Sequence, residues 1–248
     1  MKEIIIGIVQ GLTEFLPVSS SGHIALLEHY FGIFSGNLSR EVALHLATLL
    51  AVIIYFRRKI FVLVRSWLKG EELLYLWYLI LGSIPAGLVG FFLEKRIEST
   101  FASVRLIGVF LIITGIILLT TIKVRNNNEK VTGLRSIVVG FAQAFAILPG
   151  ISRSGSTIVA GLHTKMSGEE AFEFSFLLSI PAIAGAGVLE LKKVGFSGLG
   201  AHWKGALFAF IFGYLALLLL NRVVKRGKLH YFSPYLFVLG FLVIILGG

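Results

Sequence analysis

Long apolar stretches recur along the whole chain and constrain its fold more than any other feature. Six of them approach the roughly 20 residues that a helix needs to cross a bilayer. They are Val42–Phe56, Leu73–Leu93, Val104–Ile122, Ala171–Leu189, Trp203–Leu220 and Pro234–Leu246. Of the 248 residues, 56% are hydrophobic and only 15% are charged, whereas soluble domains average about 25% charged residues. The sequence therefore predicts an all-α polytopic membrane protein, in which residues 1–248 form a single membrane domain.

Two further apolar stretches, Ile4–Leu16 and Leu134–Leu148, are too short to span a bilayer. Each is followed by a proline, Pro17 or Pro149, and then by a loop rich in serine and glycine. Because a proline disfavours helix at the residue before it, both helices are expected to stop there. We therefore predict two re-entrant broken-helix hairpins, which enter the membrane and turn back, in addition to six transmembrane helices.

The two hairpins resemble each other in sequence. The matching segments are Gly7–Gln10 with Gly140–Gln143, and Ser19–Gly22 with Ser152–Gly155. Three predicted spans, an odd number, separate the copies, so the second copy is expected to be inverted in the membrane. We predict an inverted-topology repeat with pseudo-repeats of roughly 1–125 and 130–248, whose broken tips meet inside the bilayer, as in other membrane proteins with a buried site.

The net charge of +10 comes largely from basic residues that follow the first, third and fifth predicted spans. These residues are Arg57, Arg58 and Lys59, then Lys123, Arg125, Lys130 and Arg135, and finally Arg222, Lys225, Arg226 and Lys228. Basic loops prefer the cytoplasm, where they lie beside anionic lipid, so both ends of the chain are expected outside. No basic run is long, and we expect no nucleic-acid partner.

The chain contains no Cys and no Asp, and all 13 acidic residues are Glu. The absence of Cys excludes disulfides, thiolate metal sites and Cys nucleophiles. The absence of Asp excludes aspartyl nucleophiles and Asp-rich magnesium motifs.

The first predicted tip combines a carboxylate, hydroxyls and an imidazole. Gln10 and Glu14 are four residues apart and share one helix face. A carboxylate in an apolar segment is costly and is a functional candidate for that reason. Ser19–Ser21 and His23 add hydroxyls and a group that titrates near neutral pH. The alternatives are that Glu14 reaches interfacial water at a helix end and that the serines form a turn or a helix N-cap.

The second predicted tip contains a cation, Arg153, far from the basic loops. Its guanidinium offers a planar fork of donors that matches phosphate. The helix expected to resume near Thr157 favours an anion at its N-terminus, and further hydroxyls come from Ser152, Ser154 and Thr157 itself. The alternative is a structural ion pair of Arg153 with Glu14 or Glu173. We favour a phosphate site, because the hydroxyl donors suit an anion and are surplus to an ion pair.

Two other pairs of matching positions are open to interpretation. His45 and Glu173 occupy equivalent places in the repeats and either support the site or are polar residues at span ends. Ser83–Ala86 and Ser179–Ala182 share the sequence Ser-Ile-Pro-Ala. We interpret these as packing features, because proline kinks a helix.

The segments Glu14–His23 and Pro149–Thr157 resemble the two signature motifs of the undecaprenyl-diphosphate phosphatases of the BacA/UppP type. The resemblance implies a membrane hydrolase that removes the terminal phosphate of a C55 polyprenyl diphosphate and so recycles the lipid carrier of cell-wall (peptidoglycan) synthesis. It also implies bacitracin resistance on overproduction, a site that faces the outer side of the cell membrane, a divalent cation such as Mg²⁺ or Ca²⁺, and a homodimer.

Carried over to this chain, the family's motifs imply catalytic and substrate-binding residues. The catalytic set is Glu14, Ser20, His23 and Arg153, and the substrate-binding set is Gln10, Ser19, Ser152, Arg153, Ser154 and Thr157. Many relatives have Glu in place of Gln10. Because Gln10 is neutral, Glu14 is the one anionic metal ligand that the motif leaves in this chain. The nucleophile is left open: Ser20 with His23 as its base, His23 oriented by Glu14, or a water molecule.

Two other functions are compatible with parts of the pattern. A transporter or flippase of a phosphorylated polyprenyl lipid also uses inverted repeats and broken helices, and Arg153 would bind a phosphate that is never cleaved. A lipid phosphatase of the phosphatidic-acid type is disfavoured, because that mechanism expects an Asp.

Overall fold

The computed structural model describes residues 1–247 except 33–36, 71–72, 102, 125–127 and 196–197, so Arg125 lies outside the described residues. The α-helices of this part are α1 (Lys2–Phe15), α2 (Ser20–Phe31), α3 (Leu38–Tyr55), α4 (Arg57–Lys69), α5 (Leu74–Phe101), α6 (Val104–Leu119), α7 (Gly133–Phe145), α8 (Arg153–His163), α9 (Gly168–Val194), α10 (Trp203–Lys225) and α11 (Ser233–Leu246). Short 3₁₀ helices lie at Thr120–Lys123, Leu199–His202 and Leu229–Phe232.

Six helical segments in the described ranges are long and apolar enough to cross a membrane, which confirms the six predicted spans. They are Leu38–Tyr55, Leu74–Phe92, Val104–Lys123, Gly168–Val188, Leu199–Lys225 and Leu229–Leu246. The chain is therefore a multi-pass helical membrane protein. Pro85 and Pro181 lie inside α5 and α9, and both helices continue through them.

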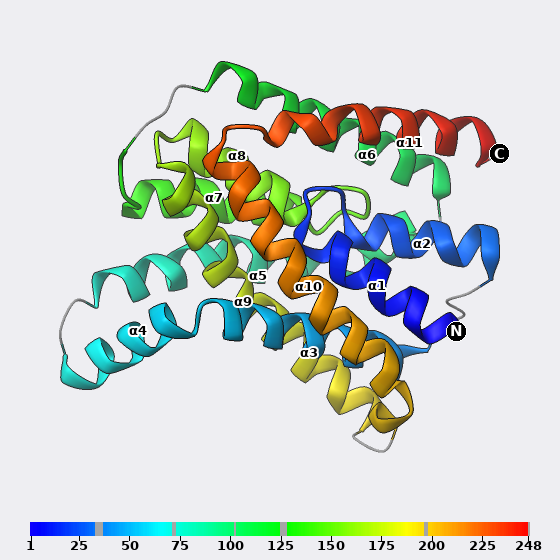
Figure 1. The fold of residues 1–248 in the computed structure, drawn as a ribbon, viewed down its shortest axis with the longest axis horizontal. Helices are drawn as coiled ribbons and strands as arrows, with labels where there is room; N and C mark the ends of the chain where they lie inside the picture. The colour runs from blue at the N-terminus through cyan, green and yellow to red at the C-terminus, as the bar shows by residue number, and fades with distance from the viewer. Residues whose placement is uncertain (33–36, 71–72, 102, 125–127, 196–197, 248) are drawn as a thin grey trace.

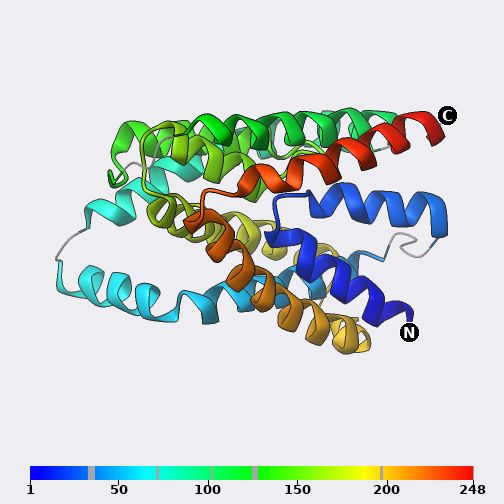
Figure 2. The same cartoon turned by 45° about the horizontal axis from the view of Figure 1, so that its top comes forward.

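Two shorter apolar helices, α1 and α7, correspond to the predicted half-helices. Each is followed by a turn and a second helix, so that α1–α2 and α7–α8 form two helical hairpins. α1 ends at Phe15 because Leu16, which precedes Pro17, is extended. Figures 1 and 2 show the turn of the α1–α2 hairpin near the middle of the molecule.

The basic segments gather at one end of the molecule, and both termini lie at the other end (Figure 1). Lys59, near the start of α4, pairs with Glu173 of α9 at 2.6 Å. Lys225, at the end of α10, pairs with Glu169 at 3.1 Å. These pairs fasten two of the basic segments to the start of α9.

Helix α4 lies where the sequence predicts only a basic loop after the first span. It is amphipathic and follows α3 directly. None of its residues is buried, and Trp67 and Leu68 are well exposed. An amphipathic helix that begins where a span ends is typical of a membrane-interface helix.

Glycines allow the half-helices to pack backbone to backbone on long helices. A Cβ at Gly7 of α1 would lie 2.2 Å from the carbonyl oxygen of Gly205 in α10. A Cβ at Gly140 of α7 would lie 2.4 Å from the carbonyl oxygen of Gly82 in α5. No side chain fits at these distances, so each contact requires glycine.

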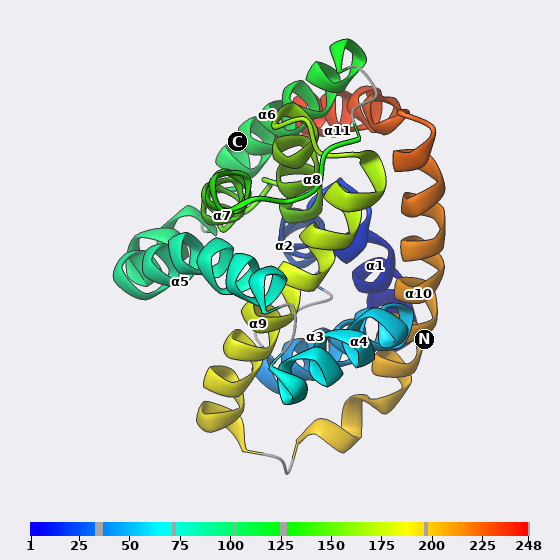
Figure 3. The ribbon, with the colours of Figure 1, turned by 90° about the vertical axis from the view of Figure 1, so that its left-hand side faces the viewer.

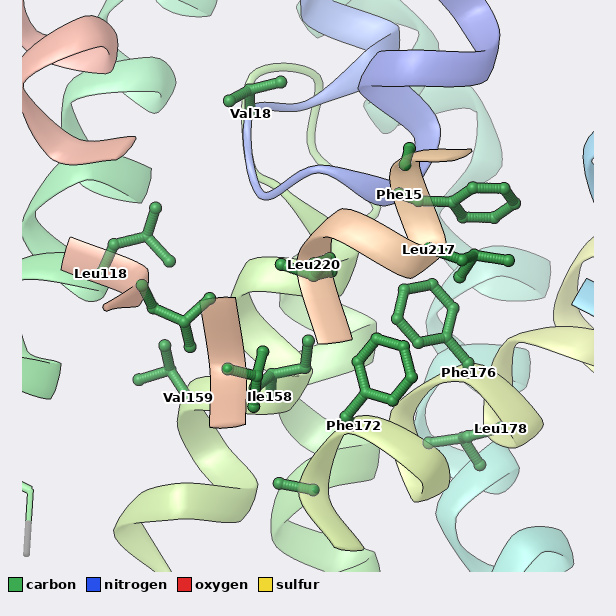
Figure 4. Close-up of a cluster of buried hydrophobic side chains, with 14 of the residues drawn as sticks. Phe15, Val18, Leu118, Ile158, Val159, Phe172, Phe176, Leu178, Leu217 and Leu220 are labelled. Carbon is green, nitrogen blue, oxygen red and sulfur yellow. The ribbon is translucent and has the colours of Figure 1, made fainter. Parts of the chain in front are cut away.

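The hydrophobic core joins the first turn to the long helices (Figure 4). The rings of Phe15 and Phe176 meet edge to face with centroids 5.5 Å apart, an arrangement that aromatic pairs prefer. Val18, Ile158 and Leu220 belong to the same cluster. This packing fixes the turn after α1 against α8, α9 and α10.

Candidate active site

The turns of the two hairpins touch each other through hydrogen bonds. The backbone N–H of Gly150 donates to Ser19 Oγ at 3.1 Å, and Ser154 Oγ donates to the carbonyl oxygen of Leu16 at 3.3 Å. Thr114 of α6 braces the second turn, because its hydroxyl donates to the carbonyl of Gly150 at 2.8 Å and accepts from the N–H of Ser152 at 3.1 Å. The sequence signals Thr114 only by a hydroxyl within an apolar span.

The first turn holds Ser20 at the start of α2. Ser19 has a left-handed backbone, with φ of 70°, which is uncommon for a residue other than glycine. Its Oγ accepts from the N–H of Gly22 at 3.3 Å and thereby caps α2. The predicted alternative of an N-cap is therefore correct for Ser19, while Ser20 is left free for other contacts.

The second turn places Arg153 as the first residue of α8. The helix begins here and not near Thr157, because Ser152 Oγ accepts from the N–H of Gly155 at 3.1 Å and caps it. Thr157 is fully buried and bonds to the carbonyl of Arg153 at 2.7 Å and to Ser175 Oγ at 2.5 Å. The hydroxyls of Thr157 and Ser154 thus bond to other protein groups. Neither residue lines the cavity described below, so in this structure they stabilise the turn.

Glu14 is the centre of the polar cluster. Its Oε1 accepts from Arg153 Nη2 at 2.7 Å, and its Oε2 accepts from Ser20 Oγ at 2.6 Å and from Gln10 Nε2 at 3.3 Å. Only 9% of the Glu14 side chain and 17% of the Arg153 side chain are exposed. The ion pair of Arg153 with Glu14, the alternative to a phosphate site, is therefore formed in this structure.

The cluster still has unused hydrogen-bonding capacity. Arg153 Nη1 and Gln10 Oε1 are buried and have no hydrogen-bond partner. A buried donor without a partner costs free energy unless a ligand or water satisfies it. Arg153 thus holds Glu14 with one nitrogen and keeps the other for a further acceptor, which is what a phosphate-binding role requires.

A cavity of about 300 Å³ opens onto this cluster. Its polar side consists of Thr13, Glu14, Ser19, Ser20, Ser21, His45, Ser152 and Arg153. Its apolar side consists of Ala146, Ile147, Ile151, Ala182, Ile183, Ala186 and Gly187. The cavity therefore brings together five of the predicted site residues: Glu14, Ser19, Ser20, Ser152 and Arg153.

His23 does not line this cavity. Its Nδ1 lies 2.8 Å from the carbonyl oxygen of Ser19, so Nδ1 carries the proton and donates. Its Nε2 lies 2.6 Å from the hydroxyl of Tyr235 in α11, and the two rings stack. The contacts expected of His23 with Ser20 or Glu14 are not formed in this structure. The ring bonds to Ser19 and Tyr235 instead, and it lines a separate apolar pocket with Leu26 and Leu242.

His45 and Glu173 separate in the structure, although they occupy equivalent positions in the sequence. His45 lines the cavity, whereas Glu173 pairs with Lys59 at the basic end of the molecule. Glu173 is therefore not the partner of Arg153.

The donors for a metal ion are few. Among the described residues, no group of three or more His or Glu side chains is placed to hold a metal ion. Glu14 is the one carboxylate among the residues that line the cavity. Mg²⁺ is often bound by one or two carboxylates together with substrate phosphates and water, so these residues fit a cation shared with a substrate and not a complete protein site.

Comparisons with known proteins agree with the motifs at the two turns. A family model described as "Bacitracin resistance protein BacA" matches residues 3–242. A protein of Methanococcus maripaludis named undecaprenyl-diphosphatase is 43% identical over 250 residues, which cover 99% of each chain. Proteins of the same name from Halothermothrix orenii and Moorella thermoacetica are 39% and 41% identical, over 100% and 98% of this chain and 98% and 96% of theirs. By this evidence, the chain belongs to the BacA family of bacitracin resistance proteins.

Proposed function

We propose that the protein is an undecaprenyl-diphosphatase, a membrane hydrolase that converts a polyprenyl diphosphate and water to the monophosphate and inorganic phosphate. The observation that carries the proposal is the buried Glu14–Ser20–Arg153 cluster, with its unsatisfied Arg153 Nη1, at the wall of a cavity. The names of the full-length relatives support the same reaction.

Arg153 is the proposed phosphate ligand. Its free Nη1 meets a phosphate oxygen first, and the guanidinium then exchanges Glu14 for the diphosphate as its anionic partner. Such an exchange keeps the cation paired throughout, which matters because an unpaired buried charge is costly. Charge-assisted bonds from the guanidinium stabilise the phosphoryl oxygens where negative charge develops.

Ser20 is the proposed nucleophile, with Glu14 as its base. Glu14 Oε2 already accepts the Ser20 proton in a hydrogen bond of 2.6 Å, and it becomes a better acceptor once Arg153 turns to the substrate. Ser20 Oγ attacks the terminal phosphorus, its proton passes to Glu14, and the bond to the bridging oxygen breaks to release the prenyl monophosphate. Water then cleaves the phosphoserine, which regenerates Ser20 and releases phosphate.

Glu14 would be the protein ligand of a divalent cation, which would also need oxygen ligands from the diphosphate and from water. The cation would neutralise charge on the phosphate oxygens. The part played by this chain's own groups is to hold that carboxylate through Gln10 Nε2 and to aim it at the cavity.

We also propose that the two hairpins are re-entrant, that the halves form an inverted repeat, and that the cavity opens to the outer side of the cell membrane. The equivalent glycines Gly7 and Gly140 support the repeat, because each packs on a long helix of the opposite half, at Gly205 or Gly82. The gathering of basic segments at one end supports the orientation.

The decisive experiment measures phosphate release from undecaprenyl diphosphate by the purified protein, with Mg²⁺, with Ca²⁺ and with a chelator. We expect release that depends on metal, and an acid-stable phosphoenzyme on rapid quenching, since phosphoserine survives acid and phosphohistidine does not. If no phosphate is released with Mg²⁺, with Ca²⁺ or with a chelator, the proposal is wrong and the flippase is favoured.

A further inference from the structure

We propose that the polyprenyl tail of the substrate leaves the active-site cavity sideways, between α5 and α9. We call this passage the lateral opening. It is bounded by Ala182, Gly185 and Ala186 of α9 and by Gly90 of α5. The inference rests on the proposed function, because it takes the diphosphate to be held at Arg153.

The cavity itself has two chemically different sides. The diphosphate group matches the side that carries Glu14, Ser20 and Arg153. The remaining lining residues, which include Ala182 and Ala186 of α9, are apolar and carry no hydrogen-bonding side chain. A pocket lined by both polar and hydrocarbon groups suits an amphiphilic ligand better than a wholly polar phosphate ester, whose polar groups would face the hydrocarbon without partners.

Helices α5 and α9 are in contact at Gly82 and Leu178 and separate towards their C-terminal ends. A Cβ at Gly82 of α5 would lie 3.1 Å from Leu178 Cδ1 of α9. Gly185 lies two turns after Leu178 on the same face of α9, and a Cβ there would meet no atom of the described residues within 4 Å. Figure 3 shows the two helices diverging towards their C-terminal ends.

The α5 side of this gap adjoins the cavity. A Cβ at Gly90, eight residues after Gly82, would have only Ile147 Cδ1 within 4 Å among the described atoms, at 4.0 Å. Ile147 is itself a wall residue of the cavity. The gap between α5 and α9 therefore begins at the cavity wall.

Two neighbouring contacts are packed where the α5–α9 gap is open. A Cβ at Gly187 of α9 would lie 3.6 Å from Leu46 of α3, an ordinary packing distance. Between the two turns, a Cβ at Gly22 would lie 3.2 Å from Gly150 Cα. The space around Gly185 is thus the side on which a hydrocarbon chain can pass from the polar cluster to the bilayer.

The first test narrows the lateral opening and compares two substrates. In Gly185→Leu, we expect kcat/KM for undecaprenyl diphosphate to fall about tenfold, which corresponds to ~1.4 kcal/mol. The five-carbon isopentenyl diphosphate is too short to reach the opening, and its kcat/KM should stay the same. Gly200→Leu is the matched control, because Gly200 is also exposed and has open space at its Cβ position.

The outcomes separate the two proposals. An equal loss for both substrates, or no loss for either, would overturn the lateral opening, including the case in which a phospholipid chain and not the substrate tail occupies it. Absence of phosphate release from both substrates by the unmodified protein would instead overturn the proposed function.

A reversible block tests the same inference without relying on how a variant folds. The chain has no Cys, so Gly185→Cys introduces one thiol. Benzyl methanethiosulfonate should abolish turnover of undecaprenyl diphosphate, and dithiothreitol should restore it. Full turnover by the labelled protein would contradict the inference.

Discussion

Glu14 accepts hydrogen bonds from three side chains, and each of them limits what the carboxylate can do. Arg153 balances its charge, Ser20 gives it a proton to accept, and Gln10 fixes its direction from one turn earlier on α1. Because two of these partners come from beyond the helix that carries Glu14, the carboxylate is aimed by the meeting of the two turns and not by α1 alone.

Replacement of Glu14 by Gln should abolish most of the activity. The amide keeps the size of the side chain but neither accepts the Ser20 proton nor pairs with Arg153. General-base catalysis contributes about 10²–10⁴-fold to a rate, so we expect kcat to fall by that order. Phosphate release by the purified variant measures the effect, with Glu28→Gln on the exposed part of α2 as the control. A variant with the kcat of the parent would exclude Glu14 as the base.

Replacement of Thr114 by Val should loosen the second turn. The fully buried hydroxyl bonds to three backbone groups: the carbonyls of Phe110 and Gly150 and the N–H of Ser152. Leaving buried groups without partners costs about 1–3 kcal/mol, so both the unfolding temperature in detergent and the activity should fall. Thr114→Ser keeps the hydroxyl and should recover most of both. A parent-like Thr114→Val beside a damaged Thr114→Ser would mean that packing of the methyl group, and not the hydrogen bonds, matters.

The sequence alone predicted part of this site. The pairing of Gln10 with Glu14 follows from helical spacing, and the cation at Arg153 follows from its position between two half-helices. The direction of the His23 ring does not follow, because it depends on Tyr235, 212 residues further along the chain. The spacing Ser19–Ser20–His23 is compatible with His23 as a base beside Ser20 and with His23 turned to another partner. The tertiary contact with Tyr235 decides which of the two is formed.

At the scale of elements, the spans were predictable because hydropathy alone identifies a helix that must cross lipid. Helix α4 was missed because its apolar residues follow helical spacing while basic residues interrupt any apolar run. Helix α8 begins four residues before Thr157, where the sequence predicts it, because Ser152 caps it. In sequence, a serine that caps a helix looks the same as a serine that binds phosphate.

The glycine contacts of the half-helices give a prediction at this scale. In Gly7→Leu or Gly140→Leu, the new side chain meets a backbone carbonyl oxygen of the neighbouring helix. Overpacking costs about 1–3 kcal/mol in ordinary cores, and a backbone neighbour yields less easily than a side chain. Both variants should therefore unfold at lower temperature than Gly200→Leu, which meets nothing. Parent-like stability in either variant would show that the helices separate easily.

The proposed orientation of the whole molecule in the membrane rests on its charge distribution, and it can be measured. Lys2 lies at the end that holds both termini, and Lys228 lies in the last basic segment at the opposite end. A single Cys at position 2 should react with a membrane-impermeant maleimide in intact cells, whereas Cys at position 228 should react only after permeabilisation. The reverse pattern would place the cavity on the cytoplasmic side and contradict the proposed orientation.

The bonds from Gly150 to Ser19 and from Ser154 to Leu16 cross between segments that are synthesised more than 130 residues apart. If the two turns form the active site as proposed, a nascent chain has no complete site while only its first half has been inserted. Two separately expressed halves should each lack phosphatase activity, and hydrolysis of the lipid diphosphate by their mixture would show that they associate.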